Sequence, residues 1–309
     1  MSGRVLVIAG PTASGKTALA VELALRLGGE VVSADSMQLY RGMDVGTAKP
    51  TAEERAGVPH HMLDVADPGE DYAVSRYGEE AAACVEDILV RGKLPIVCGG
   101  TGLYIDGLMR SGGFRESGVP TGLRARLQAE WAEDPDALRA ELARVDPPSA
   151  ARLHPNDQRR ILRALEVYRQ TGGTITEHND YTRSLPPRYE GIFLALNCAS
   201  RQTLYDRIDR RVDVMLAQGL LDEVRALRAA GALRGTAAQA IGYKEFSAYL
   251  DGEGTLEEAA DLVRQRSRNY AKRQLSWFRR DGRYHWIVRE ESGPPPLQIA
   301  TDYLKEHGL

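Results

Sequence analysis

The sequence has few cysteines, few aromatic residues and no long apolar run, and each shortage excludes a class of protein. Its 309 residues include three cysteines, Cys84, Cys98 and Cys198, which lie far apart and form no CxxC pair. A disulfide scaffold and a cysteine zinc site are therefore not expected. No apolar run approaches the roughly 20 residues that span a bilayer, so no membrane segment is expected. Aromatic residues make up only 6% of the chain, so the core should be mainly aliphatic.

The chain also lacks a large net charge. Its 40 basic and 43 acidic residues give −3, so overall charge offers no argument for a nucleic-acid partner. The N-terminus shows no signal-peptide pattern, and together with the few cysteines this predicts a reducing, cytoplasmic location. The proportions of hydrophobic and charged residues, 43% and 27%, are those of a globular protein.

Apolar patterns predict an α/β fold with two domains. Short apolar runs at 4–9, 30–34, 94–98, 191–196 and 284–288 predict strands, and helical spacing predicts helices at 17–27, 74–91, 201–217, 219–230 and 255–280. Strands that alternate with helices favour a parallel sheet flanked by helices, as in P-loop NTPases. Residues 47–71 are expected to form a long loop. Residues 118–171 suggest helices only, so we predict a catalytic core of 1–113 and 190–309 with an all-helical insertion at 114–189.

A phosphate-binding loop follows the first predicted strand. The sequence fits G-x-x-x-x-G-K-[ST] and lies between a strand and a helix, as the mechanism of this motif requires. Backbone N–H groups, the helix N-terminus and the lysine would converge on phosphate oxygens, and the last hydroxyl can ligate Mg²⁺. The predicted phosphate-binding residues are Gly10, Pro11, Thr12, Ala13, Ser14, Gly15, Lys16 and Thr17.

Two further polar segments follow predicted strands. Asp35 follows the strand at 30–34, which we expect to lie one strand over from the phosphate loop, and Gly99, Gly100 and Thr101 follow the strand at 94–98. Ligands of open parallel sheets bind at the carboxyl ends of the strands. Asp35 could hold Mg²⁺ through water, bind a ribose or act as a base, or it could simply cap the next segment. His60 and His61 lack a metal-ligand spacing, so a metal site there is not expected.

Basic residues are concentrated in two segments. One lies in the predicted insertion, from Arg152 to Arg169, and the other in residues 264–283, where eight cations accompany one acid. Arg264, Arg268 and Lys272 recur every four residues, which puts them on one helix face, apart from an apolar stripe that includes Tyr270 and Trp277. A charged helix face is usually only solvated surface. In residues 264–283, however, nearly all charges are positive and only one acid is present, which favours a polyphosphate partner such as RNA.

Taken together, these segments resemble the bacterial tRNA dimethylallyltransferase family, also called tRNA isopentenyltransferases. The resemblance rests on six segments that occur in the family's order between residue 10 and about residue 280: GPTASGKT, DSMQLY, GGTGLY, NDQRRILRALEVY, IGYKE and RNYAKRQLSWFRR. It implies transfer of a dimethylallyl group from dimethylallyl diphosphate to N6 of the adenosine at tRNA position 37, with Mg²⁺ as cofactor. No obligate protein partner is implied.

The resemblance also assigns roles to residues. It implies that the phosphate loop holds the diphosphate of the prenyl donor, that Asp35 is the general base, that Thr101 helps to hold the reacting centre, and that Thr17 ligates Mg²⁺. The residues expected to contact the tRNA anticodon stem-loop are Asp35, Ser36, Met37, Gln38, Thr101, Arg124, Arg159, Arg160, Ile161, Leu162, Arg163, Gln239, Gly242 and Lys244.

Three other classes of protein would also have a phosphate-binding loop of this kind. A nucleotide or small-molecule kinase would use Asp35 on Mg²⁺ or on the acceptor hydroxyl, but it needs neither the helical insertion nor the basic C-terminal helix. A prenyltransferase that acts on free adenylate would not need the basic insertion. An RNA-binding GTPase or ATPase module gives no reason for Asp35 and Thr101 at neighbouring strand ends.

Overall fold

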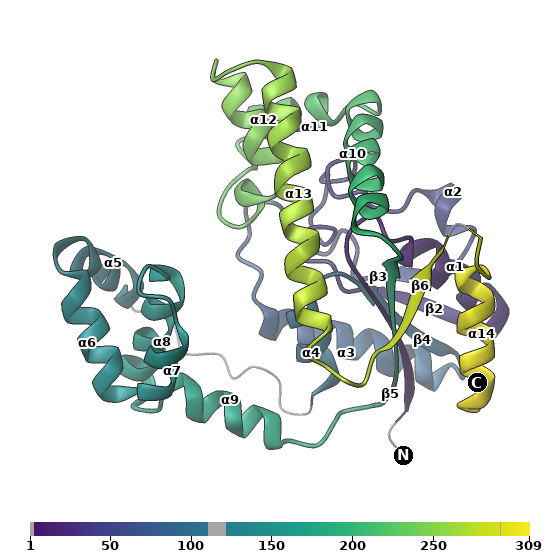
Figure 1. Cartoon of the computed structure of the whole chain (residues 1–309), viewed down its shortest axis with the longest axis horizontal. Helices are drawn as coiled ribbons and strands as arrows, with labels where there is room; N and C mark the ends of the chain where they lie inside the picture. The colour runs from purple at the N-terminus through teal and green to yellow at the C-terminus, as the bar shows by residue number, and fades with distance from the viewer. Residues whose placement is uncertain (1–2, 111–121, 291) are drawn as a thin grey trace. The chain divides into compact units, whose positions relative to one another are not determined.

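The computed structural model describes residues 3–110, 122–290 and 292–309, and the chain divides into two compact units (Figure 1). One unit contains the chain up to Met109 and from Arg188 onward, and the other contains Arg110–Pro187. The sequence placed these boundaries a few residues later, at 113/114 and 189/190.

The first unit is built on one parallel sheet of six strands. Its order is β3-β2-β4-β1-β5-β6, and every neighbouring pair is parallel. The α/β fold is therefore confirmed. The strands are β1 Arg4–Ala9, β2 Gly29–Ser33, β3 His60–His61, β4 Leu94–Gly99, β5 Glu190–Cys198 and β6 His285–Arg289.

The strand order corrects one expectation about the site. Asp35 follows β2, and the phosphate loop follows β1, but β4 lies between these two strands. The Gly99–Thr101 segment at the end of β4 therefore separates the two loops, and Asp35 is two strands from the phosphate loop rather than one. The order of the strands along the chain did not reveal this arrangement, because β4 comes after β2 in the sequence but lies between β2 and β1 in the sheet.

Helices cover both faces of the sheet, and β1 shows how the sequence divides between them. Val5, Val7 and Ala9 pack toward the cluster that includes α3 (Val74–Val90) and α4 (Gly102–Met109), whereas Leu6 and Ile8 pack toward α1 (Lys16–Leu27) and α14 (Pro296–Glu306). Successive side chains of a strand point to opposite faces, so a strand buried on both sides is apolar throughout. This explains why the run at 4–9 shows no alternation.

A layer of helices continues beyond the carboxyl ends of the strands. The 23-residue α13 packs against α10 and α12, and Thr255 and Glu258, three residues apart, form a capping box at its start. The helices of this layer are α10 Arg201–Ala217, α11 Leu220–Ala229, η1 Ala237–Gln239, α12 Tyr243–Leu250 and α13 Leu256–Phe278.

The second unit is entirely helical where the structure describes it. Its core is aliphatic and includes Leu127, Leu138, Leu142 and Leu165. Aspartates at 134, 146 and 157 cap three of the helices through their side chains, which satisfies N–H groups that have no partner within the helix. The helices are α5 Leu123–Glu133, α6 Pro135–Val145, α7 Pro147–Arg152, α8 Gln158–Thr171 and α9 Ile175–Ser184.

Several short elements escaped the sequence patterns. The segment 47–71, expected as a loop, contains α2 (Ala52–Arg55) and β3, and helices α9, α12 and α14 were not predicted. Pro296 begins α14, directly after two further prolines. Proline lacks an N–H group but fits the first turn of a helix, where that group would have no partner. No helix in the described ranges is long and apolar enough to cross a membrane.

A buried carboxylate anchors the amino-terminal end of β2. The side chain of Glu30 is only 2% exposed, and it accepts hydrogen bonds from Arg91, from Lys93 at 2.7 Å and from His61 at 2.8 Å. His60 instead bonds the carbonyl of Val58. The two histidines are thus used in local contacts, and no cluster of metal-ligating side chains occurs among the described residues.

Glu30 should make stability sensitive to acid. Hydrogen bonds from Arg91 hold its pKa well below the usual range, although burial opposes the shift. Stability from a lowered carboxyl pKa is present above the unfolded value, about 4.3, and is lost as the pH falls toward the folded value. We therefore expect Glu30→Gln to reduce stability at pH 7 and to flatten its decline below pH ~4.5. Urea unfolding between pH 3 and 7 measures this, with Glu22→Gln on the exposed face of α1 as control; parallel profiles for Glu30→Gln and the parent would contradict the assignment.

Candidate active site

The phosphate loop takes its shape from two glycines. Gly10 follows β1 with φ of +148°, and a Cβ there would lie 2.7 Å from the carbonyl oxygen of Leu196. Gly15 has φ of +95° and forms the N-cap of α1. Only glycine accepts both the positive φ and this close approach. The loop therefore ends at a helix N-terminus, where N–H groups and the helix dipole favour an anion.

Two helices far along the chain hold this loop in place. Gln274 of α13 is 4% exposed; its Oε1 accepts the N–H of Thr12 at 2.9 Å, and its Nε2 donates to the carbonyl of Gly100 at 2.9 Å. Arg207 of α10 donates from Nε to the carbonyl of Ala13 at 2.7 Å. One buried amide thus links the phosphate loop to the Gly99–Thr101 segment. Gln274 lies within the segment RNYAKRQLSWFRR, but the sequence assigned it no role, and Arg207 lies outside all six segments of the resemblance.

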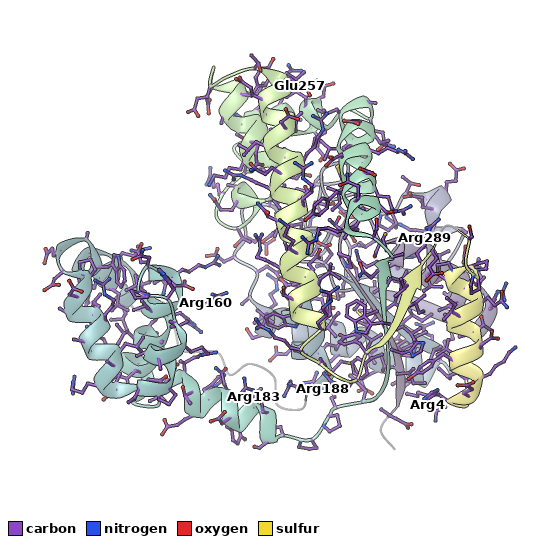
Figure 2. The ribbon with its side chains drawn as sticks, in the orientation of Figure 1. Arg4, Arg160, Arg183, Arg188, Glu257 and Arg289 are labelled. Atoms are coloured by element: carbon purple, nitrogen blue, oxygen red, sulfur yellow. The ribbon has the colours of Figure 1, made fainter. Side chains whose placement is uncertain are left out.

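Cations surround the loop. Burial lowers the pKa of Lys16, and the nearby charge of Arg211 lowers it further, while Cys98 and Asp35 oppose this. Burial likewise lowers the pKa of Arg211. A Cβ on Gly15 would lie 3.5 Å from Nη1 of Arg289, which stands at the end of β6 (Figure 2), and 3.8 Å from Nη2 of Arg207. Lys16, Arg207 and Arg211 are half-buried and Arg289 is exposed, so several positive charges gather around one loop, which suits a multiply charged anion.

Asp35 and Thr101 come together at the ends of β2 and β4. Oδ1 of Asp35 accepts the N–H of Met37 at 2.9 Å, and Oγ1 of Thr101 accepts the N–H of Ser36 at 3.1 Å. The N–H of Thr101 donates to the carbonyl of Ala34 at 3.1 Å. Oδ2 of Asp35 has no hydrogen-bond partner within the described part of the chain, which leaves it available to accept a proton.

Electrostatic interactions place Asp35 in the same site as the cations. Burial lowers the pKa of both Lys16 and Arg211, and the negative charge of Asp35 opposes this shift in each case. On α13, burial and then the charge of Asp35 raise the pKa of Tyr270 to about 12, while its hydrogen bonds with Thr101 and Gln274 oppose the shift. A half-buried carboxylate, a hydroxyl and a tyrosine therefore face the cationic loop. This arrangement can neutralise a leaving anion and remove a proton from an acceptor.

Comparisons with known proteins identify the family of this chain. The family model described as IPP transferase matches residues 38–281, and one described as isopentenyl transferase matches residues 3–66. The chain belongs to the IPP transferase family. It is 46% identical to a tRNA dimethylallyltransferase of Pelotomaculum thermopropionicum, over 92% of this chain and 90% of the relative, and 45% identical to that of Acetivibrio thermocellus, over 99% and 98%.

Solved structures of this family share the fold. A tRNA isopentenylpyrophosphate transferase from Bacillus halodurans gives a TM-score of 0.73 at 40% identity, covering 99% of this chain and 96% of its own. A eukaryotic dimethylallyltransferase acting on tRNA gives a TM-score of 0.83 at 32% identity, covering 99% of this chain and 80% of its own. These matches support the IPP transferase reading and not the kinase alternative.

A metal site of the expected kind fits the residues present in this IPP transferase. The Thr17 hydroxyl lies in the first turn of α1 and makes no hydrogen bond to another described residue. Mg²⁺ commonly takes one or two protein oxygens and completes its shell with substrate phosphates and water. The Thr17 hydroxyl, beside a loop that binds anions, can supply one such protein oxygen. The remaining ligands of the metal would come from the substrate phosphates and water, so no further protein side chain is required.

Gln38 has a supporting position in this IPP transferase. Its Nε2 donates to the carbonyls of Thr47 at 3.2 Å and Ala48 at 3.1 Å, and its Oε1 accepts from the hydroxyl of Ser33 at 3.2 Å. Both amide hydrogens are therefore used within the protein. The side chain ties the turn after Asp35 to the segment 43–48 rather than presenting free donors to a ligand.

Glu223 of α11 holds that segment from the other side. Its carboxylate accepts the N–H groups of Asp44, Val45 and Gly46 at 2.7–3.0 Å and the hydroxyl of Tyr243 at 2.5 Å. A Cβ on Gly46 would lie 2.6 Å from the Tyr243 ring, so only glycine fits there. Since Gln38 bonds the same segment, Glu223 supports the Asp35 turn indirectly.

Glu223→Gln should therefore loosen this segment. One carboxylate oxygen becomes an amide that faces N–H donors, so at least one hydrogen bond is lost and a donor is left unpaired, at a cost of about 1–3 kcal/mol. We expect lower stability in urea unfolding and faster hydrogen exchange at the amides of residues 44–46. Asp222→Asn, at the neighbouring exposed position on α11, is the control. Unchanged exchange at those amides would show that Glu223 does not hold the segment.

The helical unit presents part of the expected RNA-binding set. Arg159, Arg160 and Arg163 of α8 are exposed, and Figure 2 labels Arg160 at the surface of this unit. Arg124 of α5 donates to the carbonyl of Arg159 at 3.4 Å. Two other residues expected to contact RNA, Ile161 and Leu162, are 2% and 1% exposed because they belong to the aliphatic core of the unit. Their side chains support the arginines and do not reach the surface.

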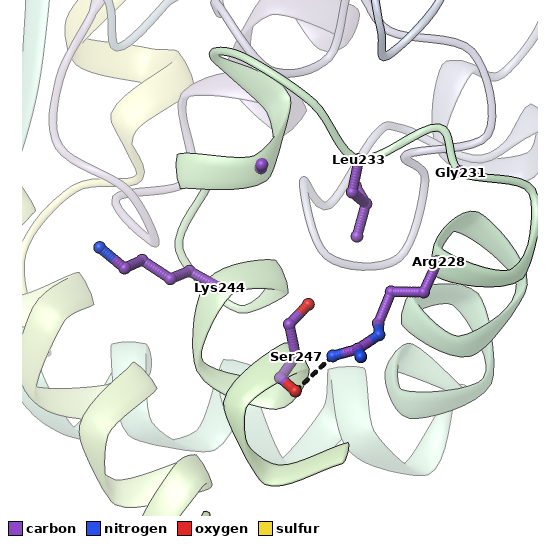
Figure 3. A pocket seen from close by; sticks show the side chains of 6 residues that line it. Arg228, Gly231, Leu233, Lys244 and Ser247 are labelled. Atoms are coloured by element: carbon purple, nitrogen blue, oxygen red, sulfur yellow. Dashed lines mark hydrogen bonds between the residues drawn. The ribbon is translucent and has the colours of Figure 1, made fainter. Parts of the chain in front are cut away.

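The remaining expected contacts lie at the start of α12 and just before it, and one of them, Lys244, lines a small cavity. Lys244 is exposed and donates to Oε1 of Gln239 at 3.1 Å, and Gly242 caps α12 with φ of +96°. Lys244 and Arg228 line a cavity of about 300 Å³ between α11 and α12 (Figure 3). Arg228 bonds the carbonyl of Ser247 and the carboxylate of Asp251, so Lys244 is the more available cation.

The basic stripe on α13 is largely neutralised by other helices, contrary to expectation. Arg264 pairs with Asp213 at 2.6 Å, and Arg268 pairs with Asp209 at 2.6 Å, both on α10. Arg266 lies 2.8 Å from Glu245 of α12. The acids missing from residues 264–283 are thus supplied by neighbouring helices. The first half of α13 is a packing surface with ion pairs, and only its C-terminal part remains a candidate for RNA.

Proposed function

We propose that this chain transfers the dimethylallyl group of dimethylallyl diphosphate to N6 of the adenosine at tRNA position 37. One observation supports this above others: Thr101 bonds the turn that carries Asp35, and Gln274 ties Gly100 to the phosphate loop, so the anion-binding loop and the carboxylate belong to one hydrogen-bonded site. The resemblance of nearly the whole chain to enzymes named tRNA dimethylallyltransferase supports the identity of both substrates. A tRNA substrate also favours the cytoplasm as the site of activity.

The reaction exchanges one bond for another. The bond between C1 of the dimethylallyl group and the diphosphate oxygen breaks, and a bond forms between C1 and adenine N6. Negative charge grows on the departing diphosphate, where Lys16, Arg207, Arg211 and the N–H groups of the loop are already oriented to stabilise it. Thr17 would hold Mg²⁺, which supplies further positive charge to the leaving group.

Asp35 acts on the acceptor. The lone pair of adenine N6 is delocalised into the ring, so the nitrogen is a weak nucleophile until its proton is removed. Oδ2 of Asp35 accepts that proton as the carbon–nitrogen bond forms, while the N–H of Met37 keeps Oδ1 in place. Thr101, bonded to Ser36 and Tyr270, helps to orient the reacting centre. Proton acceptance of this kind contributes about 10²–10⁴-fold in rate.

The acceptor base must leave the stacked anticodon loop to reach this carboxylate. Extrusion costs a few kcal/mol and least in a single-stranded loop. Asp35, Ser36 and Met37 would contact the extruded adenine, with Gln38 supporting their turn. Arg124, Arg159, Arg160 and Arg163 would bind phosphates of the stem-loop, and Gln239, Gly242 and Lys244 would form a second RNA contact.

Mass analysis of nucleosides tests the proposal directly. An anticodon stem-loop RNA is incubated with the protein, Mg²⁺ and dimethylallyl diphosphate, and the RNA is then digested. We expect one adenosine to gain the mass of a dimethylallyl group in place of hydrogen, only when all components are present. Transfer of label from ATP to a small acceptor, or prenylation of free adenylate without modification of the RNA, would contradict it.

A further inference from the structure

An exposed tryptophan lies next to the candidate active site. Tyr270, Gln274 and Trp277 follow one another along a single face of α13, and the first two contact Thr101 and the loops of the site. The sequence pattern placed Trp277 in a buried stripe, but the residue is 41% exposed. Single exposed apolar side chains are ordinary on protein surfaces, but this one shares a helix face with two residues that contact the candidate active site.

Contacts fix which part of the indole ring is open. A Cβ on Gly102 would lie 2.2 Å from both Cδ1 and Nε1 of Trp277. The five-membered edge of the ring is therefore seated on the backbone of Gly102, which only a residue without a side chain permits. Gly102 directly follows Thr101, and the next residue, Leu103, is also 41% exposed. Two exposed apolar side chains thus belong to the segment that directly follows Thr101 and to the helix packed on it.

Two arginines follow Trp277 in the sequence, and they differ from the arginines in the first half of α13. Arg279 and Arg280 are exposed and have no ion pair or hydrogen bond from their side chains to residues that the structure describes. Arg264 and Arg268, by contrast, are paired with carboxylates of α10. The end of α13 therefore combines an open aromatic ring with two available positive charges.

We propose that Trp277 is a stacking platform for an unpaired nucleobase of the RNA acceptor, beside the base that reacts. The inference rests on the proposed function, which supplies a single-stranded loop as ligand. Proteins bind unpaired bases by stacking them on aromatic side chains while nearby cations bind the phosphates. Extruding one base also removes a stacking partner from its neighbours, and a platform next to Thr101 replaces that partner. An apolar ligand such as the prenyl chain would leave Arg279 and Arg280 without a role.

Binding of a synthetic anticodon stem-loop to three variants gives the first test. We expect Trp277→Ala to raise the Kd for the RNA by about 5-fold to 150-fold, whereas Trp277→Phe, which keeps an aromatic face, should retain most of the affinity. Leu256→Ala is the matched control, because Leu256 is 40% exposed at the opposite end of the same helix. The KM for dimethylallyl diphosphate should stay within about two-fold in all three variants.

Fluorescence provides a readout that a purely structural role would not change. A variant with Trp131→Phe and Trp286→Phe keeps Trp277 as its only tryptophan, and stacking on a base should quench its emission when the stem-loop is added. Stem-loops with an abasic site at each loop position in turn identify the partner. At one loop position, the abasic site should weaken binding of the stem-loop to the parent protein but not to the Trp277→Ala variant.

The outcomes separate this inference from the proposed function. If the parent modifies the stem-loop, but Trp277→Ala binds it within two-fold and the emission does not change, the platform alone is overturned. A loss confined to the KM of dimethylallyl diphosphate would overturn it too, because Trp277 would then line the donor site. If the parent neither binds nor modifies the stem-loop, the proposed function fails and the platform fails with it.

Discussion

Asp35→Asn should reduce turnover by about 10²–10⁴-fold while leaving RNA affinity within a few-fold of the parent. Asparagine keeps an oxygen to accept the N–H of Met37, which Oδ1 of Asp35 accepts at 2.9 Å, so the turn after β2 should be preserved. The substitution removes the group that takes the proton from adenine N6. Single-turnover transfer to a saturating stem-loop measures the chemical step, and a direct titration measures binding.

The choice of control sharpens this experiment. Asp206 lies exposed on α10 and accepts a hydrogen bond from Gln202 at 2.7 Å. Asp206→Asn therefore makes the same chemical change away from the site and should leave both quantities unchanged. If Asp35→Asn retained turnover within ten-fold of the parent, another group would have to accept the proton, and Asp35 would be only a loop residue. A loss of RNA affinity equal to the loss of turnover would instead assign Asp35 to binding.

The sequence predicted those parts of the site that a short segment can specify. The phosphate loop needs particular residues within eight positions between a strand and a helix, so the motif predicted the loop that the structure shows after β1. The positions of Asp35 and Thr101 at the carboxyl edge of the sheet could be predicted because each lies two residues after the end of a buried parallel strand. The capping box at Thr255 is likewise local.

Long-range contacts could not be predicted in this way. Gln274 and Arg207 bond the phosphate loop from 262 and 194 residues further along the chain. Arg207 and Arg211 also lie in a helix where acids and bases alternate, a pattern typical of solvated surface. The pairing of the α13 arginines with α10 depends on helix packing, which charge counts within one segment do not reveal. The order of the strands in the sheet could not be predicted for the same reason: β4 lies between β1 and β2 in the folded protein, and the sequence pattern of single strands does not show this.

Lys16→Met should lower kcat/KM for dimethylallyl diphosphate by about 10²–10³-fold, the range seen when one preorganised charge-stabilising donor is removed. Methionine retains the apolar stem in a buried position, so folding should be affected little. RNA affinity should stay within a few-fold because the ammonium serves the donor. Lys305→Met, exposed on α14, should behave as the parent does. A loss in RNA affinity without a loss in kcat/KM for the donor would contradict the assignment.

The pH dependence of activity with dimethylallyl diphosphate also tests the role of Lys16, this time by a change at Arg211. Burial, with the charge of Arg211, lowers the pKa of Lys16 from its usual value, so Lys16 loses its proton at a lower pH than a free lysine does. Activity on the donor should therefore decline on the alkaline side as Lys16 becomes neutral. Arg211→Met removes a positive charge and should raise the pKa of Lys16, which moves this decline to higher pH even though overall activity falls. An alkaline limb that stayed in place in Arg211→Met, or that persisted in Lys16→Met, would mean that a different group controls donor binding.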